Sequence, residues 1–263
     1  MNYLNKLLKK LKKAPLSIDE FNSILEKSDT VFQSVELEKE LLFLNGFPLN
    51  FTEEYVSLKT TTTKIEDQTF CIVDIETSAG NAKDGQIIEI GAIKYKNNQI
   101  IEKYESLVNT REIPRKVQEL TGIIPEITHD APTIKTVLEE FKIFLEDDIF
   151  VAHAISFDYK FISDSMKKYD LGELCNRKLC TIDLSEKLIE IERYGLKYLK
   201  EHLNIDDENH HRAYSDAYCT TMVLEECLSL LPKDIVYSEE LIDFSKSQKR
   251  QYYSKKLSGS ILI

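Results

Sequence analysis

Two carboxylates stand one residue apart where an apolar stretch of the sequence ends. The stretch reads FCIVDIE from Phe70 to Glu76, and its apolar character predicts a buried strand that carries Asp74 and Glu76 near its end. Residues i and i+2 of a strand project to the same side, so both carboxylates would aim at one point. Like charges held together repel, which makes a bound cation one explanation of the pair. Ordinary solvated charge at a strand end is the other, because 45 of the 263 residues are acidic and such pairs are frequent.

A third acidic residue, a histidine and a fourth acidic residue follow in later segments. Asp158 comes after the apolar run 149–152, where a short strand is predicted to lead into a helix. Taken alone, it could equally be an acid stabilised by the dipole of a helix N-terminus. His211 lies five residues before Asp216, which begins an apolar-faced helix. Five steps of ~100° place two side chains of one helix about 140° apart, so His211 reaches the same point only from the preceding loop. A solvated loop histidine is the alternative.

Three segments of the chain together resemble the motifs of a known family. They read DIET (74–77), HAISFD (153–158) and HRAYSD (211–216), and in this order and at these separations they are similar to the motifs of the DEDDh 3′→5′ exonucleases. The resemblance extends over about residues 68–232 and includes the stretches IIEIGAIKY, LVNTREIP, VQELTGI and FLEDDIFVAH. Within this family, the chain looks most like the epsilon-type proofreading subunit of bacterial replicative DNA polymerase.

The resemblance implies a role for each of seven residues. Four carboxylates would bind two divalent metal ions, Mg²⁺ or Mn²⁺, both of which prefer oxygen ligands. His211 would be the general base that takes a proton from the attacking water. Thr77 and Phe157 would flank the terminal nucleotide of the substrate. The four implied metal ligands are Asp74, Glu76, Asp158 and Asp216.

The chain departs from the family pattern in two places. The family commonly has Thr-Thr-Gly after the first motif's Glu, whereas this chain has Thr77-Ser78-Ala79-Gly80, which shifts the glycine by one position. The Asn that usually follows the second motif's His is Ala154, which removes a side-chain amide. Neither change removes an implied metal ligand or the base. His210 is adjacent to His211 but stands one place too early for the HxAxxD pattern.

The apolar periodicity predicts the elements that would position these residues. Strand patterns cover 70–76, 86–96 and 99–108, with Asn97-Asn98 as a tight turn, and helical spacing covers 133–146 and 157–169. Residues 183–231 are mainly helical in pattern. Strands first and then strand–helix alternation predict an α/β domain with a mixed sheet flanked by helices, which is also what the RNase H-like fold of the family implies.

The sequence divides into three predicted parts. Residues 1–62 have mostly helical patterns, and we expect a small, mostly helical module, with a winged-helix-like arrangement as one form of it. The polar run TTTTKIEDQT (60–69) is the predicted boundary, after which the exonuclease domain covers 68–232. Residues 233–263 are predicted to be a basic C-terminal tail. The lysines near both ends fit solvated tails, and a polymer- or partner-binding arm is the alternative.

Composition limits the kinds of partner. A net charge of −11 argues against wholesale coating of a nucleic-acid backbone, but it leaves room for a site that holds one strand end through metal ions. No apolar run approaches the ~18 residues of a membrane span, so no membrane partner is expected. Five cysteines without a CxxC pair, and an N-terminus without an apolar leader, indicate a cytoplasmic protein.

The sequence therefore predicts a metal-dependent 3′→5′ exonuclease that converts DNA to nucleoside 5′-monophosphates. Its substrate would be a single-stranded or frayed 3′ DNA end, and its expected role is proofreading beside a DNA polymerase catalytic subunit. Two alternatives stay open at this point. One is a 3′ exonuclease of the same superfamily that acts on RNA or short oligonucleotides. The other is a replisome adaptor whose nuclease activity is secondary.

Overall fold

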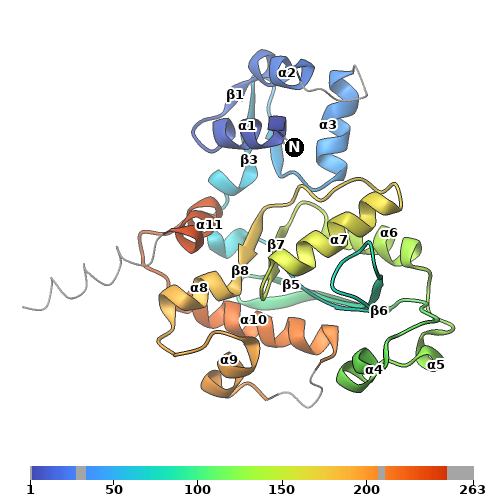
Figure 1. The fold of residues 1–263 in the computed structure, drawn as a ribbon. Coiled ribbons are helices and arrows are strands. Elements are labelled where there is room, and N and C mark those ends of the chain that lie inside the picture. Colours follow the sequence, from blue (N-terminus) through green and yellow to red (C-terminus); the bar gives the residue numbers. More distant parts are fainter. Residues whose placement is uncertain (1, 28–33, 207–210, 248–263) are drawn as a thin grey trace, which may run out of the picture.

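A five-stranded mixed sheet forms the centre of the larger part of the molecule (Figure 1). The computed structural model describes residues 2–27, 34–206 and 211–247. The strands lie in the order β6-β5-β4-β7-β8; β5 is antiparallel to β4 and β6, and β7 is parallel to β4 and β8. Their bounds are β4 (Phe70–Thr77), β5 (Ile87–Lys96), β6 (Gln99–Leu107), β7 (Ile149–Ala152) and β8 (Lys178–Cys180). The mixed α/β sheet predicted from the sequence is confirmed.

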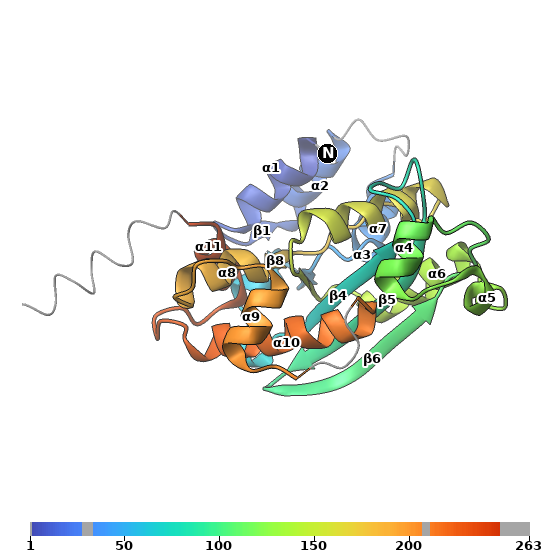
Figure 2. The same cartoon turned by 60° about the horizontal axis from the view of Figure 1, so that its bottom comes forward.

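Helices cover both faces of this sheet (Figures 1 and 2). One face carries two helices, and the other carries three, beside which a fourth helix, α11 (Ser238–Lys246), packs into the same core. They are α6 (Ile134–Leu145) and α7 (Ser156–Lys168) on the first face, and α8 (Thr181–Leu188), α9 (Leu196–Leu203) and α10 (Ala213–Ser229) on the second. Within residues 2–27, 34–206 and 211–247, no helix is both long and apolar enough to cross a lipid bilayer.

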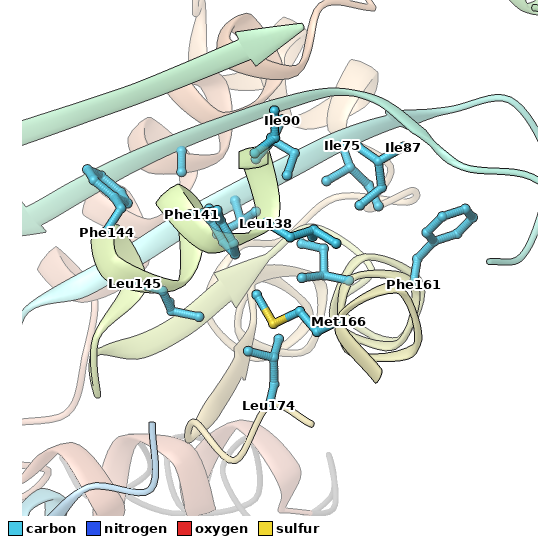
Figure 3. Close-up of a cluster of buried hydrophobic side chains, with 14 of the residues drawn as sticks. Ile75, Ile87, Ile90, Leu138, Phe141, Phe144, Leu145, Phe161, Met166 and Leu174 are labelled. Atoms are coloured by element: carbon cyan, nitrogen blue, oxygen red, sulfur yellow. The ribbon is translucent and has the colours of Figure 1, made fainter. Parts of the chain in front are cut away.

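The central strand β4 explains why the sheet is buried on both sides. Side chains alternate across a strand, so Cys71, Val73 and Ile75 enter the core formed with α6 and α7. Phe70 and Ile72 enter the opposite core, which α8 and α10 complete. Figure 3 shows how the first core fills; its largest members there include Ile75, Phe141, Phe144, Phe161 and Met166. Because β4 is apolar on both faces, its carboxylates appear only where the strand leaves these cores.

Local turn chemistry sets the ends of several elements. Asn97 and Asn98 both have positive φ, 50° and 56°, which is the geometry of the tight hairpin turn that joins β5 to β6. Helix α4 (Arg115–Thr121) begins directly after Pro114 and ends at Gly122, whose φ of 70° forms a left-handed C-cap. A short helix, α5 (Pro125–Thr128), follows it.

The N-terminal residues build a separate small core. Its largest fully buried side chains include Phe21 and Leu58. The elements are α1 (Asn2–Leu11), β1 (Leu16–Ser17), α2 (Ile18–Glu26), α3 (Val35–Leu44), β2 (Leu49–Phe51) and β3 (Tyr55–Leu58), and the strands pair in the order β1-β3-β2. These residues are mostly helical, as predicted, and they also form a small sheet whose strands of two to four residues are too short for a detectable period. The domain boundaries and the winged-helix-like arrangement stay predictions.

The C-terminal residues differ from the predicted basic tail over the part that the structure describes. Residues 238–246 form helix α11 (Ser238–Lys246), and Leu241, Ile242 and Phe244 on this helix are buried. Helix α11 also joins the rest of the molecule through a buried ion pair between Glu239 and Arg177, 2.5 Å apart. Its apolar residues at helical spacing explain why it packs rather than extends into solvent. The remainder of the predicted tail, 248–263, lies outside the described residues.

Candidate active site

The first two predicted carboxylates stand where β4 leaves the core. Asp74 and Glu76 project to the same side of β4 as Phe70 and Ile72, which is the face covered by α10. Both side chains are half-buried. Strand β7 pairs with β4 only as far as Ile72, so beyond this residue one edge of β4 is open to other groups. The end of β4 thus offers carboxylates on its face and free backbone groups along its edge.

Asp158 joins this open edge from helix α7. It is the third residue of the helix and is only 4% exposed. Its carboxylate accepts hydrogen bonds from its own backbone N–H and from that of Ile75, the residue between Asp74 and Glu76. The contact satisfies a backbone donor that the sheet leaves unpaired, and it brings a third carboxylate against the same stretch of β4.

Asp216 and His211 come from the start of α10. Asp216 is the fourth residue of that helix, whereas His211 precedes it and has a φ of 60°, in the left-handed region. Glu76, His211 and Asp216 each offer one ligand atom, and these atoms lie within 4.8 Å of one another. The arrangement matches the expectation that His211 must stand in the loop before the helix to meet Asp216. His210 lies outside the described residues.

The electrostatics of the carboxylates reflect their mutual proximity. Burial, followed by the charges of Asp158, Asp216, Glu76 and Glu89, raises the pKa of Asp74 well above its usual value. Burial, together with neighbouring acids that include Asp216, raises the pKa of Glu76 to about 8. Burial raises the pKa of Asp158 to about 7, although its two backbone hydrogen bonds oppose this shift. Without a counter-charge, the cluster therefore holds protons near neutral pH.

The donor set of the cluster suits hard divalent cations. Its members are carboxylate oxygens with one imidazole nearby, and no cysteine is among them. Magnesium and manganese prefer oxygen ligands, whereas thiolates and several imidazoles would favour zinc or copper. A cation between these side chains would also replace the protons that the raised pKa values retain. The residues present therefore fit the metal ions that the sequence motifs imply.

Thr77 and Phe157 lie at the rim of the same region. Thr77 ends β4, and its hydroxyl donates a hydrogen bond to the backbone carbonyl of Ala79, 2.8 Å away, inside the loop that departs from the family pattern. Phe157 precedes Asp158 on α7 and is 41% exposed, with its ring 5.8 Å from that of Phe161. An exposed aromatic ring beside a carboxylate cluster offers a surface on which a nucleobase can stack.

Helix α9 lines one side of a cavity at the site, which the sequence motifs did not indicate. A cavity of about 840 Å³ is lined by Lys197 and Lys200 together with His211 and Asp216. Glu201 and Asp206 line it as well, so its charge is mixed. Sequence reasoning placed 183–231 in helices but could not foresee which helical face would turn toward the cluster, since that depends on tertiary packing.

Two further residues beside the cluster also escaped prediction. Glu89, near the start of the apolar stretch IIEIGAIKY, is completely buried in β5 and pairs with Arg212 at the start of α10. The glutamate itself could have indicated such a contact, because a charged residue in a buried strand needs a partner. Without the fold, nothing in the sequence identified that partner.

Comparison with known proteins now settles the family. A family model described as an exonuclease matches residues 71–224, which is more than half of the chain and runs from β4 into α10. The chain belongs to this exonuclease family. The match confirms the resemblance that the three motifs indicated, and it includes every implied site residue within its bounds.

Two relatives of the chain are much longer proteins. The DNA polymerase III PolC-type of Thermotoga maritima is 37% identical over 168 residues, which cover 64% of this chain and 12% of that protein. The PolC-type polymerase of Staphylococcus saprophyticus is 31% identical over 214 residues, which cover 81% of this chain and 14% of that protein. The chain thus spans only about an eighth to a seventh of the length of these relatives.

Solved structures share the fold of the exonuclease. Exonuclease X, in complex with 5′ overhanging duplex DNA, aligns with a TM-score of 0.54 and 22% identity, covering 67% of this chain and 99% of that one. Escherichia coli exonuclease I, in complex with a dA16 oligonucleotide, aligns with a TM-score of 0.57 and 16% identity, covering 68% and 43% of the two chains. These matches confirm the predicted RNase H-like mixed α/β fold.

Proposed function

We propose that this exonuclease removes nucleotides from the 3′ end of DNA as nucleoside 5′-monophosphates, in a reaction that depends on two divalent cations. The observation that carries the proposal is the convergence of Glu76, His211 and Asp216 from two distant segments, with ligand atoms within 4.8 Å of one another. Carboxylates brought together in a half-buried site repel each other, so this arrangement is unfavourable unless bound cations offset the repulsion.

The proposed metal ligands are Asp74, Glu76, Asp158 and Asp216. When bound, two Mg²⁺ or Mn²⁺ ions would activate the attacking water and stabilise the leaving 3′ oxygen. Four carboxylates nominally balance the charge of two such ions, so the loaded site would no longer repel a polyanion. This explains how a chain with a net charge of −11 can receive a DNA end.

The remaining site residues act directly on water and on the terminal nucleotide. His211 is exposed and stands before α10, so its imidazole can reach a water molecule between Glu76 and Asp216 and accept its proton. Phe157 offers its ring to the terminal base, and Thr77 shapes the loop on the other side of that nucleotide. These contacts would orient the last phosphodiester without reading sequence.

The names of the relatives and of the similar structures favour DNA as the substrate and a polymerase as the partner. The PolC-type relatives are named DNA polymerases, and the exonuclease X and exonuclease I structures are titled as complexes with DNA. We therefore propose a single-stranded or frayed 3′ DNA end as the substrate and a DNA polymerase catalytic subunit as the partner, with proofreading as the role. A cytoplasmic location follows from that partner.

A comparison of substrates tests this assignment. Wild-type protein is incubated with Mg²⁺ or with EDTA and given a primer–template with a 3′ mismatch, the matched primer–template, and single-stranded DNA and RNA of one sequence. We expect Mg²⁺-dependent removal of the mismatched nucleotide faster than of the matched one, and DNA cleaved faster than RNA. Faster hydrolysis of RNA would instead assign the chain to RNA trimming, and the absence of hydrolysis would leave the adaptor role.

A further inference from the structure

Glu89 is a carboxylate in a position where its charge is unfavourable unless neighbouring groups compensate it. It is the third residue of β5, is 0% exposed, and stands directly opposite Glu76 in the β4–β5 ladder. Two acids opposed on neighbouring strands destabilise a sheet, and a buried carboxylate is unfavourable without hydrogen-bond partners. A residue in this position must therefore be compensated by a specific contact.

The compensation comes from the first residues of α10. The Glu89 carboxylate accepts hydrogen bonds from Arg212 Nε, at 2.9 and 3.1 Å, and from Arg212 Nη2, at 2.5 Å. It also accepts one from the backbone N–H of Ala213, at 2.8 Å. A guanidinium held by two of its nitrogens is fixed in orientation as well as in position. Both donors lie in the chain between His211 and Asp216.

A glycine two residues farther along β5 permits this close approach. A Cβ atom on Gly91 would lie 2.2 Å from the backbone nitrogen of Tyr214 and 2.3 Å from the carbonyl carbon of Ala213. The first turn of α10 therefore rests directly on the β5 backbone beside the Glu89 contact. The Glu89 hydrogen bonds and the close contact at Gly91 together leave Arg212, the residue before α10, little freedom to move.

We propose that the Glu89–Arg212 clamp positions His211 for the reaction, by fixing the neighbouring residue of the chain against the sheet. His211 adopts a φ of 60°, which a non-glycine residue holds only when its surroundings impose it. The clamp supplies that constraint on its C-terminal side. This inference rests on the proposed function, and it makes Glu89 and Arg212 positioning residues that touch neither substrate nor metal.

The decisive substitution is Arg212→Lys, which keeps the charge but loses the two-nitrogen fork. We expect its kcat on single-stranded DNA to fall about 10-fold to 100-fold while KM changes less than about 3-fold, because a small misplacement of a reacting group reduces turnover by this order. Glu89→Gln should act in the same direction. Glu105→Gln is the matched control: its carboxylate lies 3.9 Å from Arg212 at the exposed rim, outside the clamp, and its removal should leave kcat unchanged.

The second measurement separates positioning from a general loss of structure. Arg212→Lys is also made in the His211→Ala background, where it should reduce kcat by less than about 2-fold, since the group it positions is already gone. Equal losses in both backgrounds would overturn the inference, as would wild-type kcat in Arg212→Lys. Circular dichroism and thermal unfolding of each variant identify any that fail to fold. Because the Arg212 side chain is 37% exposed, Arg212→Lys is the most conservative of these changes and remains as the test if another variant fails to fold.

Failure of the inference can be told apart from failure of the proposed function. Wild-type protein and Asp74→Asn are assayed beside the other variants. An inactive wild type, or an Asp74→Asn variant of full activity, would refute the proposed function and the clamp with it. An active wild type with an inactive Asp74→Asn variant and an unaffected Arg212→Lys variant would refute the clamp alone.

Discussion

Replacing Asp158 with Asn should stabilise the metal-free protein strongly at pH 8 and hardly at all at pH 4. The carboxylate is 4% exposed, and burial raises its pKa from 3.8 to about 7. Since the folded state binds the proton more tightly than the unfolded state, this residue does not destabilise the fold below pH 3.8. Its unfavourable contribution grows as the pH rises from there to about 7 and is complete above that.

The size of the effect follows from the two pKa values. The interval between 3.8 and about 7, at ~1.4 kcal/mol per pH unit, makes the ionised Asp158 unfavourable by about 4 kcal/mol at pH 8. The same relation leaves most of this contribution at pH 6 and little of it at pH 4. Asn is neutral at every pH and close to Asp in volume, so the gain in unfolding free energy on Asp158→Asn should follow this curve.

Urea unfolding in EDTA at pH 4, 6 and 8 measures the gain directly. Asp164→Asn on the same helix is the matched control, because that carboxylate is 46% exposed and pairs with Lys160 at the surface; it should change stability by less than about 0.5 kcal/mol at each pH. A gain for Asp158→Asn that does not depend on pH, or a loss of stability at pH 8, would refute the account of the carboxylate cluster.

Three further outcomes follow from the same structure. His211→Ala should lower turnover by ~10² or more and leave Mn²⁺ affinity by calorimetry within about 3-fold of wild type, as expected for a lost general base; near-wild-type turnover would contradict the assignment. Phe141→Ala, which empties a 0% exposed position between α6 and the sheet, should lower the unfolding free energy by about 3–5 kcal/mol in urea, and a loss below 1 kcal/mol would mean that this core is loosely packed. Ala154 has a φ of 68°, so Ala154→Asn should raise the unfolding free energy by about 0.5–1 kcal/mol, because Asn tolerates the left-handed region better than Ala does; a lower melting temperature would contradict this.

The parts of the fold that follow from the sequence are those with a long hydrophobic period or a strong turn residue. Apolar side chains of strand β4 point alternately into two different cores, and its carboxylates come only where those cores end. The hairpin after β5 follows from two asparagines that tolerate positive φ, and the end of α4 follows from Gly122. Each of these features is decided by residues that are neighbours in the chain.

The features that could not be predicted depend on contacts between distant segments. The pairing of Glu89 with Arg212 spans more than a hundred residues, and only the crossing of β5 by α10 creates it. The lysines around helix α11 favoured a solvated tail, and its three buried apolar residues became informative only once their packing into the core beside α8 and α10 was known. The convergence of His211 with Glu76 was implied by the family motifs, and its geometry fits, but the roles of these residues stay predictions.

The direction and metal dependence of DNA hydrolysis test the central claim most directly. Single-stranded DNA labelled at its 5′ end is incubated with wild-type protein and with Asp74→Asn, in Mg²⁺ and in EDTA, and the products are resolved by length over time. We predict a ladder that shortens one nucleotide at a time from the 3′ end, in Mg²⁺ and with wild-type protein alone, together with released nucleoside 5′-monophosphates. Cleavage that persists in EDTA or in Asp74→Asn, or immediate release of a labelled mononucleotide from the 5′ end, would contradict it.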